Sequence, residues 1–172
     1  MFLNIKEMEV RKIPFDETFE PGEIDFSETG LRQSGGIHTE GSAKVVDNTD
    51  GEVRIQGRFT AVMEADCDRC LGVATYPLDQ TFDLFYRPPL GPEADELKID
   101  DGEAEIGFYE GLGLELADVV KEQILLAMPM QRICREDCKG ICPVCGRNRN
   151  EAACDCHVEV ADDRWRALKN LK

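Results

Sequence analysis

Apolar and polar residues alternate through much of the first half of the chain, most clearly from residue 53 to residue 64. Val53, Ile55, Phe59, Ala61 and Met63 are apolar, and most residues between them are polar. Successive side chains of a β-strand point to opposite faces, so this period of two predicts a half-buried strand. Residues 72–86 repeat the pattern and predict a partner strand. The two strands flank a Cys-x2-Cys pair, which is therefore expected at the tip of a hairpin.

Weaker alternation predicts three further strands, over residues 9–15, 36–46 and 103–109. Residues 88–105 collect prolines, glycines and acidic residues, a composition that buries little and predicts a loop. Together these patterns favour an antiparallel sheet with long hairpins, or a small β-barrel.

Apolar residues recur at spacings of three and four from Leu112 to Met128, which predicts one amphipathic helix packed on the sheet. Pro129 is expected to end this helix, because proline lacks a backbone donor and disfavours helical geometry in the preceding residue. A short final helix is predicted from Asp162, a favourable N-cap. The predicted fold is thus α+β, with an acidic β-rich body over 1–131 and a cysteine-rich zinc ribbon and terminal helix over 132–172.

The net charge of −15 is unevenly distributed. Residues 1–131 carry 28 acidic and 11 basic side chains, whereas residues 132–172 carry 7 acidic and 9 basic ones. The acidic body is expected to repel nucleic acid and to suit a basic protein partner. Contact with nucleic acid or with a partner is instead expected in the second segment, although solvated charges or compensation of nearby thiolates would give the same pattern. The candidate contact residues are Arg132, Arg135, Lys139, Arg147 and Arg149.

No cationic stretch followed by an apolar run begins this sequence, and no run of eighteen apolar residues occurs in it. A cytoplasmic protein without a membrane segment is therefore expected.

Eight cysteines lie in close pairs, each with another cysteine within four residues. Zinc binds four thiolates tetrahedrally, and a two-residue spacer lets one tight turn present two sulfurs to a single ion. Pro143 presets such a turn between Cys142 and Cys145, and Gly146 can adopt the positive φ that the turn needs. The predicted metal ligands are Cys67, Cys70, Cys134, Cys138, Cys142, Cys145, Cys154 and Cys156.

Three other uses of these cysteines must be compared with zinc binding. Disulfides need an oxidising compartment, and cysteines so close in sequence close only very small loops. A thiol-disulfide redox protein could use Cys142 and Cys145, although their Gly-, Asn- and Arg-rich surroundings predict a loop rather than the usual strand and helix. An iron-sulfur cluster also takes four cysteines and is compatible with the spacing.

The ligands are expected to divide between two zinc ions per chain. Cys142 and Cys145 pair with Cys154 and Cys156, because the eight residues between the two pairs can return as a small ribbon. Cys134 and Cys138 are left to meet Cys67 and Cys70, which would join the hairpin tip to the segment after the long helix. A single zinc ion using part of the set is the alternative. His157 could replace Cys156, and His38 is expected to be incidental.

No enzyme class is supported by the sequence. The tripeptide His-x-Glu occurs at His38 and at His157, but the remainder of the zinc deaminase signature is missing. Neither a Walker A loop nor a Gly-x-Ser-x-Gly elbow is present. A zinc-stabilised protein–protein adaptor without RNA contact remains an alternative to an RNA-related role.

These motifs in combination resemble the bacterial large ribosomal RNA subunit accumulation proteins, the YceD-like family. The resemblance covers most of residues 50–172. It implies a cytoplasmic, non-enzymatic role in the synthesis, processing or stability of 23S ribosomal RNA, and hence in large-subunit assembly. With that role, the basic partner would be a ribosomal or RNA-processing protein, and the basic second segment would contact ribosomal RNA. Its motifs are Cys67-Asp68-Arg69-Cys70-Leu71, the helix ending Leu126-Ala127-Met128-Pro129, Cys134, Cys138, the run from Gly140 to Gly146, Asn148, Asn150 and Asp163-Arg164.

Overall fold

The computed structural model describes residues 1–89 and 106–156 of the chain. These residues belong to two units, each described by itself. The first unit contains Met1–Ala65 and Thr75–Met130, and the second contains Asp66–Ala74 and the chain from Gln131 onward. The strands are β1 (Phe2–Asn4), β2 (Ile13–Phe19), β3 (Leu31–Gln33), β4 (Ile37–Val45), β5 (Val53–Asp66), β6 (Val73–Arg87), β7 (Ile106–Phe108) and β8 (Gly113–Glu115). The helices are α1 (Ile5–Val10), the 3-10 turn η1 (Ser27–Thr29) and α2 (Leu116–Ala127).

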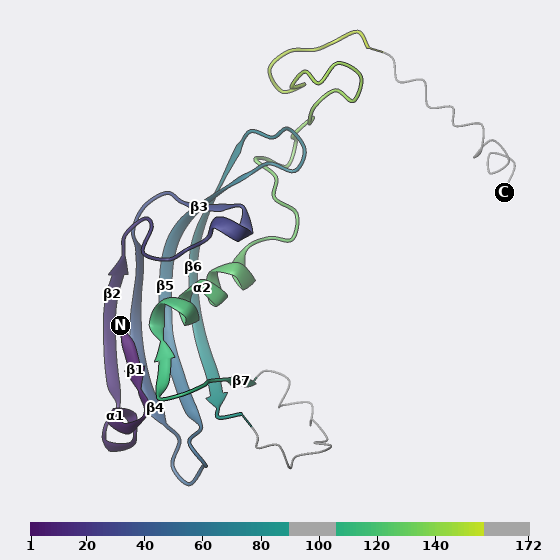
Figure 1. Cartoon of the computed structure of the whole chain (residues 1–172). Helices are drawn as coiled ribbons and strands as arrows, with labels where there is room; N and C mark the ends of the chain where they lie inside the picture. Colours follow the sequence, from purple (N-terminus) through teal and green to yellow (C-terminus); the bar gives the residue numbers. More distant parts are fainter. Residues whose placement is uncertain (90–105, 157–172) are drawn as a thin grey trace, which may run out of the picture. The chain divides into compact units, whose positions relative to one another are not determined.

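The first unit is built on a six-stranded sheet of order β2-β4-β5-β6-β7, with β3 pairing along β5 (Figure 1). The predicted hairpin of β5 and β6 is confirmed, and β4 pairs antiparallel with β5 from Val45↔Val53 to His38↔Thr60. β7 runs parallel to β6, so the expectation of a purely antiparallel sheet is wrong at this edge. The barrel alternative is also wrong for the described residues, in which β2 and β7 are opposite ends of the strand order.

The alternating pattern of β5 corresponds to its burial. Val53, Ile55, Phe59, Ala61 and Met63 are all buried and share the core with α2, which lies across one face of the sheet (Figure 1). This burial is the main stabilising contribution in the first unit.

Two glycines bring the sheet backbone close to aromatic rings. Gly41 of β4 lies opposite Gly57 of β5, and a Cβ atom at either position would collide with Phe15 or Phe82 and with the neighbouring backbone. Glycine is required here because the rings occupy the space that a side chain would fill.

The first α-helix lies where the sequence predicted the start of a strand. Residues 9–15 were expected to be extended, but residues 5–10 form α1 and the strand begins only at Ile13. The Asn4 side chain accepts a hydrogen bond from the Lys6 backbone N–H (3.0 Å) and caps the helix. Met8 is the buried residue of this helix. A helix of six residues with one buried side chain gives too weak a periodicity to be detected in the sequence.

The long helix begins four residues later than predicted. Residues 113–115 form β8, which pairs with β1, and α2 starts at Leu116. A Cβ atom at Gly113 would overlap the Leu3 carbonyl, so the close approach of β1 depends on this glycine. The helix ends at Ala127, two residues before Pro129, in agreement with the prediction.

Several predictions concern residues outside the described ranges. They are the loop over 90–105, the start of the strand predicted over 103–109, a role for His157, and the final helix from Asp162. Neither α1 nor α2 has the length and apolar character that a membrane span requires.

Candidate metal centre

The first cysteine cluster begins at the tip of the β5–β6 hairpin. The Leu71 N–H donates to the Cys67 carbonyl (2.9 Å), and the Cys67 N–H donates to the Gly72 carbonyl (2.8 Å). These bonds close a tight turn with both cysteines of the Cys67–Cys70 pair on it. The sequence folds this way because a two-residue spacer leaves room for only one turn.

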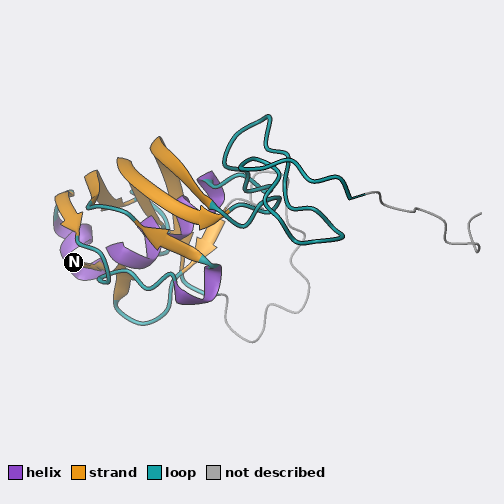
Figure 2. Cartoon of the chain, turned by 90° about the horizontal axis from the view of Figure 1, so that it is seen from above, coloured by secondary structure: helices purple, strands orange, loops and turns teal. Residues whose placement is uncertain are grey.

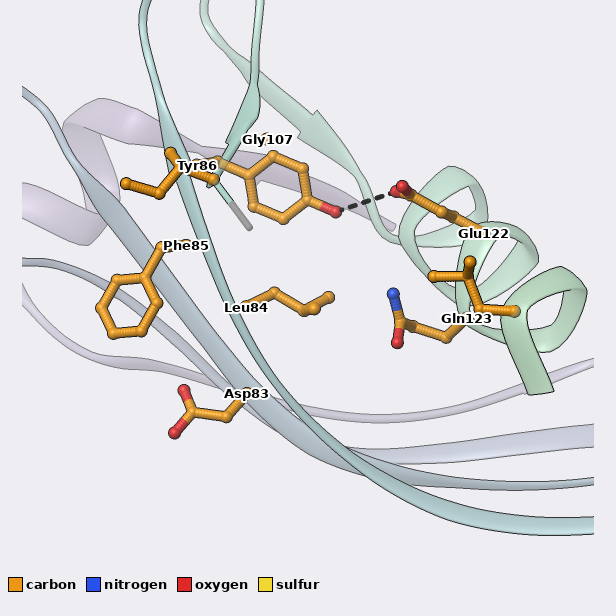
Figure 3. A pocket seen from close by; sticks show the side chains of 9 residues that line it. Asp83, Leu84, Phe85, Tyr86, Gly107, Glu122 and Gln123 are labelled. Atoms are coloured by element: carbon orange, nitrogen blue, oxygen red, sulfur yellow. Dashed lines mark hydrogen bonds between the residues drawn. The ribbon is translucent and has the colours of Figure 1, made fainter. Parts of the chain in front are cut away.

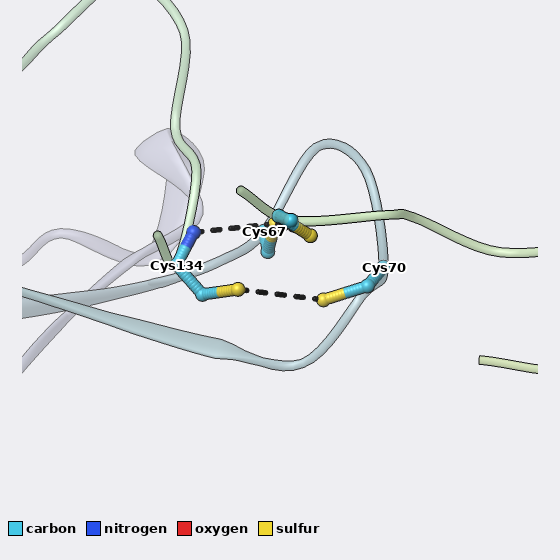
Figure 4. Close-up of side chains that lie close together, drawn as sticks. Cys67, Cys70 and Cys134 are labelled. Carbon is cyan, nitrogen blue, oxygen red and sulfur yellow. Dashed lines mark hydrogen bonds between the residues drawn. The ribbon is translucent and has the colours of Figure 1, made fainter. Parts of the chain in front are cut away.

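The segment after α2 lies against this turn. The Asp68 N–H donates to the Arg132 carbonyl, and the Arg132 N–H donates to the Asp68 carboxylate, both at 2.7 Å. These two bonds fix the position of Cys134, whose N–H donates to the Cys67 sulfur (3.3 Å; Figure 4). The Arg69 guanidinium also donates to the Cys138 carbonyl (3.3 Å). The predicted meeting of these distant cysteines is therefore present in the structure.

The sulfur positions fit a single tetrahedral ion. The Sγ atoms of Cys67 and Cys138 are 3.8 Å apart, those of Cys70 and Cys134 are 3.7 Å apart (Figure 4), and all four lie within 4.8 Å of one another. A tetrahedron with metal–sulfur bonds of about 2.3 Å has edges of about 3.8 Å. Disulfide bonds are about 2.05 Å long, and all eight cysteines are free. The first cluster could therefore hold a metal ion.

The second cluster is formed by the ribbon over residues 140–156. Ile141 and Asn148 form an antiparallel bridge, and the Cys142 N–H donates to the Arg147 carbonyl (2.8 Å). The Gly146 N–H donates to the Cys142 carbonyl (2.8 Å), which closes the turn. Four sulfurs again lie within 4.8 Å of one another, so this cluster could also hold a metal ion. They belong to Cys142, Cys145, Cys154 and Cys156.

Hydrogen bonds to sulfur contribute to different pKa values for the thiols of the first cluster. Burial raises the pKa of Cys67, but amide donors led by the Cys134 N–H outweigh it and lower that pKa to about 6. The Asn150 side-chain amide lowers the pKa of Cys138. Desolvation and the adjacent Cys138 thiol raise the pKa of Cys134 to about 12.

The second cluster shows the same separation. Backbone amides of Cys145 and Val144 lower the pKa of Cys142 to about 6, whereas hydrogen bonding with Cys145 raises the pKa of Cys156 to about 12. Four adjacent thiols cannot all ionise without a cation between them, so some thiols retain protons and others lose theirs. Such a site releases protons when it binds a metal ion.

Asn150 connects the two clusters. It lies on the ribbon between Cys145 and Cys154, yet its side-chain N–H donates to the Cys138 sulfur of the first cluster (3.3 Å). Its carbonyl oxygen accepts from the Lys139 N–H (2.8 Å) and from the Arg135 guanidinium (3.0 Å). Asn148 holds it in place by accepting from both nitrogens of Asn150 at 3.0 Å. Folding of the ribbon thus supplies a donor to the other site.

The two Cys-x2-Cys turns differ at the residue that follows the second cysteine. This position has a positive φ in both turns, +60° at Leu71 and +71° at Gly146. Glycine adopts this conformation without steric cost, whereas for leucine it costs roughly 1–2 kcal/mol. The Leu71 side chain is also largely exposed, so burial does not offset that cost.

The five basic candidates have different surroundings. Arg135 pairs with Asp137 (3.2 Å) and Arg147 donates to the Ala153 carbonyl (3.3 Å). Arg132 is half-buried and interacts with another group of the protein. Lys139 and Arg149 are exposed, and within the described part of the chain neither side chain has a hydrogen-bond or ion-pair partner. These two are therefore the basic side chains most accessible to a partner.

Sequence reasoning assigned no structural role to Asp68, Arg69 or Asn150, although all three help to hold the clusters. Each is a polar residue inside or beside a cysteine turn, a position from which hydrogen bonds to ligand sulfurs and turn carbonyls are usual. Their exact partners depend on contacts across more than ten residues, which the spacing of the cysteines does not specify.

Fold and site together define a protein with a β-sheet unit and a cysteine-rich unit carrying two candidate metal sites. The model of the family "Large ribosomal RNA subunit accumulation protein YceD" matches residues 55–172, which include all eight cysteines. The chain therefore belongs to the YceD family, and the resemblance inferred from its motifs is confirmed.

The curated relatives extend this comparison. The chain is 26% identical to the uncharacterized protein YlbN of Bacillus subtilis over 169 residues, which cover 97% of this chain and 92% of YlbN. It is 27% identical to the uncharacterized protein Rv2926c of Mycobacterium tuberculosis, matching 73% of this chain and 58% of that protein. It is 32% identical to the chloroplastic YCED homolog 1 of Arabidopsis thaliana over 59 residues, covering 34% of this chain and 18% of the homolog. No solved structure matches the chain.

Replacing Asn150 is expected to weaken one metal site and spare the other. In Asn150→Asp the carbonyl acceptor remains, but the donor to the Cys138 sulfur is lost and a negative charge takes its place. We expect metal release from the first cluster to a chelator to accelerate roughly 10- to 100-fold. Gln131→Glu is the matched control, since it makes the same change from amide to carboxylate on an exposed side chain of the second unit that has no hydrogen bond to a sulfur among the described residues. Equal release from both sites, or no change in Asn150→Asp, would contradict the role given to Asn150.

Substitutions at the two positive-φ positions, Leu71 and Gly146, are expected to change the free energy of unfolding in opposite directions. Leu71→Asn should raise the free energy of unfolding of the metal-loaded protein by up to about 1 kcal/mol, because asparagine tolerates the left-handed conformation better than leucine. Gly146→Leu should lower it by roughly 1–2 kcal/mol. Denaturant unfolding of both variants is the measurement. A Leu71→Asn protein less stable than wild type would mean that the leucine side chain makes a stabilising contact.

Proposed function

We propose that this chain is a non-enzymatic, zinc-binding factor of the cytoplasm that supports the accumulation of 23S ribosomal RNA during large-subunit assembly. The observation that carries the proposal is the family match over residues 55–172, since the family is described by large ribosomal RNA subunit accumulation. The chloroplast relative bears the same description in its name.

Zinc is favoured by the donor set of the two clusters. Each consists of four thiols spaced for one ion, and the described residues add no histidine or carboxylate to either group. A zinc site with four protein ligands is typical of structural rather than catalytic zinc. A four-iron cluster binds each cysteine to a different iron, which requires sulfurs farther apart than the ligands of one ion. The redox alternative at Cys142 and Cys145 is less well supported, because both belong to the second four-thiol group.

We propose that the second unit makes the contact with RNA. The second unit presents Lys139 and Arg149 with no acidic partner among the described residues. The Arg149 N–H donates to the Gly140 carbonyl (2.9 Å), which holds the Arg149 backbone near Lys139. Exposed cations on a rigid loop suit phosphate groups, whereas the acidic first unit repels them.

Metal analysis tests the zinc part of the proposal. Protein purified without chelators should be colourless and contain close to two zinc ions per chain, with thiols that do not react until the metal is removed. Cys70→Ser and Cys145→Ser should each reduce the content towards one ion, because each removes a ligand from a different cluster. One ion per chain with four reactive thiols, or a coloured iron-containing protein, would refute the two-zinc assignment.

RNA binding tests the functional part. In Lys139→Gln/Arg149→Gln, we expect the affinity for 23S ribosomal RNA to fall at least tenfold at low salt, and the slope of log K against log salt to decrease by roughly 1.4, as for two lost phosphate contacts on single strands. In cells lacking the wild-type chain, this variant should fail to restore the ratio of 23S to 16S RNA. Arg11→Gln/Lys12→Gln removes the same charge from the first unit and is the control. Unchanged binding in the first variant, or an equal loss in the control, would argue against this RNA surface.

A further inference from the structure

A groove runs along α2 on the first unit. Two adjoining hollows, of about 380 and 340 Å³, share Tyr86 and Glu122. In the larger one the side chains of Leu84 and Tyr86 point from β6 towards α2, and the Tyr86 hydroxyl donates to the Glu122 carboxylate (3.3 Å; Figure 3). Burial, and then the Glu122 charge, raise the pKa of Tyr86, so its hydroxyl remains a donor.

Large apolar side chains lie exposed along this groove. Phe2 and Phe108 line the smaller hollow, and Leu126 lines the larger one. Their exposed fractions are 46%, 59% and 72%. Single exposed apolar residues are common on protein surfaces, but three of them along one groove form a patch of the kind that binds another molecule.

The helix side of the groove is negatively charged. Glu115 is the N-cap residue of α2, and Asp118 and Glu122 follow it at spacings of three and four, so the three carboxylates lie along one side of the helix. All three residues line the smaller hollow. Within residues 1–89 and 106–156 none of the three forms an ion pair. Asp83 differs, since its carboxylate points away from α2 (Figure 3) and is bound by the Arg54 guanidinium at 2.6 and 2.8 Å. The groove therefore combines exposed apolar surface with three uncompensated carboxylates.

We propose that this groove binds a cationic, amphipathic segment of a protein partner, with apolar side chains in the hollows and lysines or arginines against Glu115, Asp118 and Glu122. The carboxylates disfavour RNA and anionic lipid, both of which carry negative charge. The apolar residues favour a peptide over a small cation. The choice of a basic protein rests on the proposed function, because ribosomal RNA is bound by basic proteins.

Two other segments of this chain differ in how well their charge suits the groove. Residues 90–105, which lead into β7, contain seven acidic side chains and one lysine, and their charge has the wrong sign. Residues 164–172 contain four basic and no acidic side chains and have the right sign, so they enter the test as a competing occupant.

The test uses the full chain and an 18-residue peptide with leucine and lysine at helical spacing as a labelled probe. Binding is followed by fluorescence anisotropy in the absence of RNA, so the result does not depend on the RNA experiment. Glu115→Gln/Asp118→Asn/Glu122→Gln should weaken binding at least tenfold, and Phe108→Ser/Leu126→Ser should do the same. A peptide with serine in place of each leucine should bind at least tenfold more weakly than the probe.

The control variant is Asp16→Asn/Glu17→Gln/Glu40→Gln, which removes three acidic charges from β2 and β4 at the opposite edge of the sheet. Its affinity for the probe should stay within about twofold of wild type. An equal loss in this control, or no loss in the groove variants, overturns the proposal. If neutralising Arg164, Arg166, Lys169 and Lys172 tightens probe binding tenfold, the groove belongs to the terminal segment of this chain and not to a partner.

Discussion

The second unit depends on contacts between sulfurs. In its described part the buried apolar side chains are four cysteines and Ala74, whereas the first unit buries a large set of aliphatic and aromatic residues. A segment this small cannot cover a hydrophobic core, and its strand structure is limited to the ends of β5 and β6 and one bridge. Figure 2 shows it almost entirely as loops and turns. Its stability must therefore come mainly from the interaction that holds the four thiols of each cluster together. Where that interaction is binding to structural zinc, the free energy of metal binding is a large part of the free energy of folding.

The two clusters do not form independently. The Ile141 N–H donates to the Arg69 carbonyl (2.9 Å), and a Cβ atom at Gly140 would approach the same carbonyl to 2.9 Å. Asn150 adds its bond to the Cys138 sulfur. The ribbon with the second cluster is thus attached to the turn with the first by backbone and side-chain bonds. Loss of order in the ribbon therefore removes hydrogen-bond donors from the first cluster and its turn and weakens that site.

The sequence predicted well those features that depend on nearby residues. The period of two in β5, the turn at Cys142–Cys145 and the stop at Pro129 are all local, and all are present. It failed where pairing with a distant segment decides the structure. Residues 113–115 read as part of a helix but form β8, because β1 provides a strand partner more than 100 residues earlier. The direction of β7 and the bond from Asn150 to Cys138 likewise depend on tertiary contacts that no local pattern encodes.

Charge limits what the basic residues of the second unit can do. Its described part contains six basic and six acidic side chains, a balance of zero before the thiolates are counted. With zinc in both clusters, eight thiolates and two divalent ions add a charge of about −4. Most of these arginines therefore offset acidic side chains and thiolates and do not create a positive field. This balance gives the described part of the second unit no net attraction for RNA over long distances, so the proposed phosphate contact has to be short-range and made by cations that have no acidic partner among the described residues. Lys139 and Arg149 meet this condition, whereas the basic segment as a whole does not.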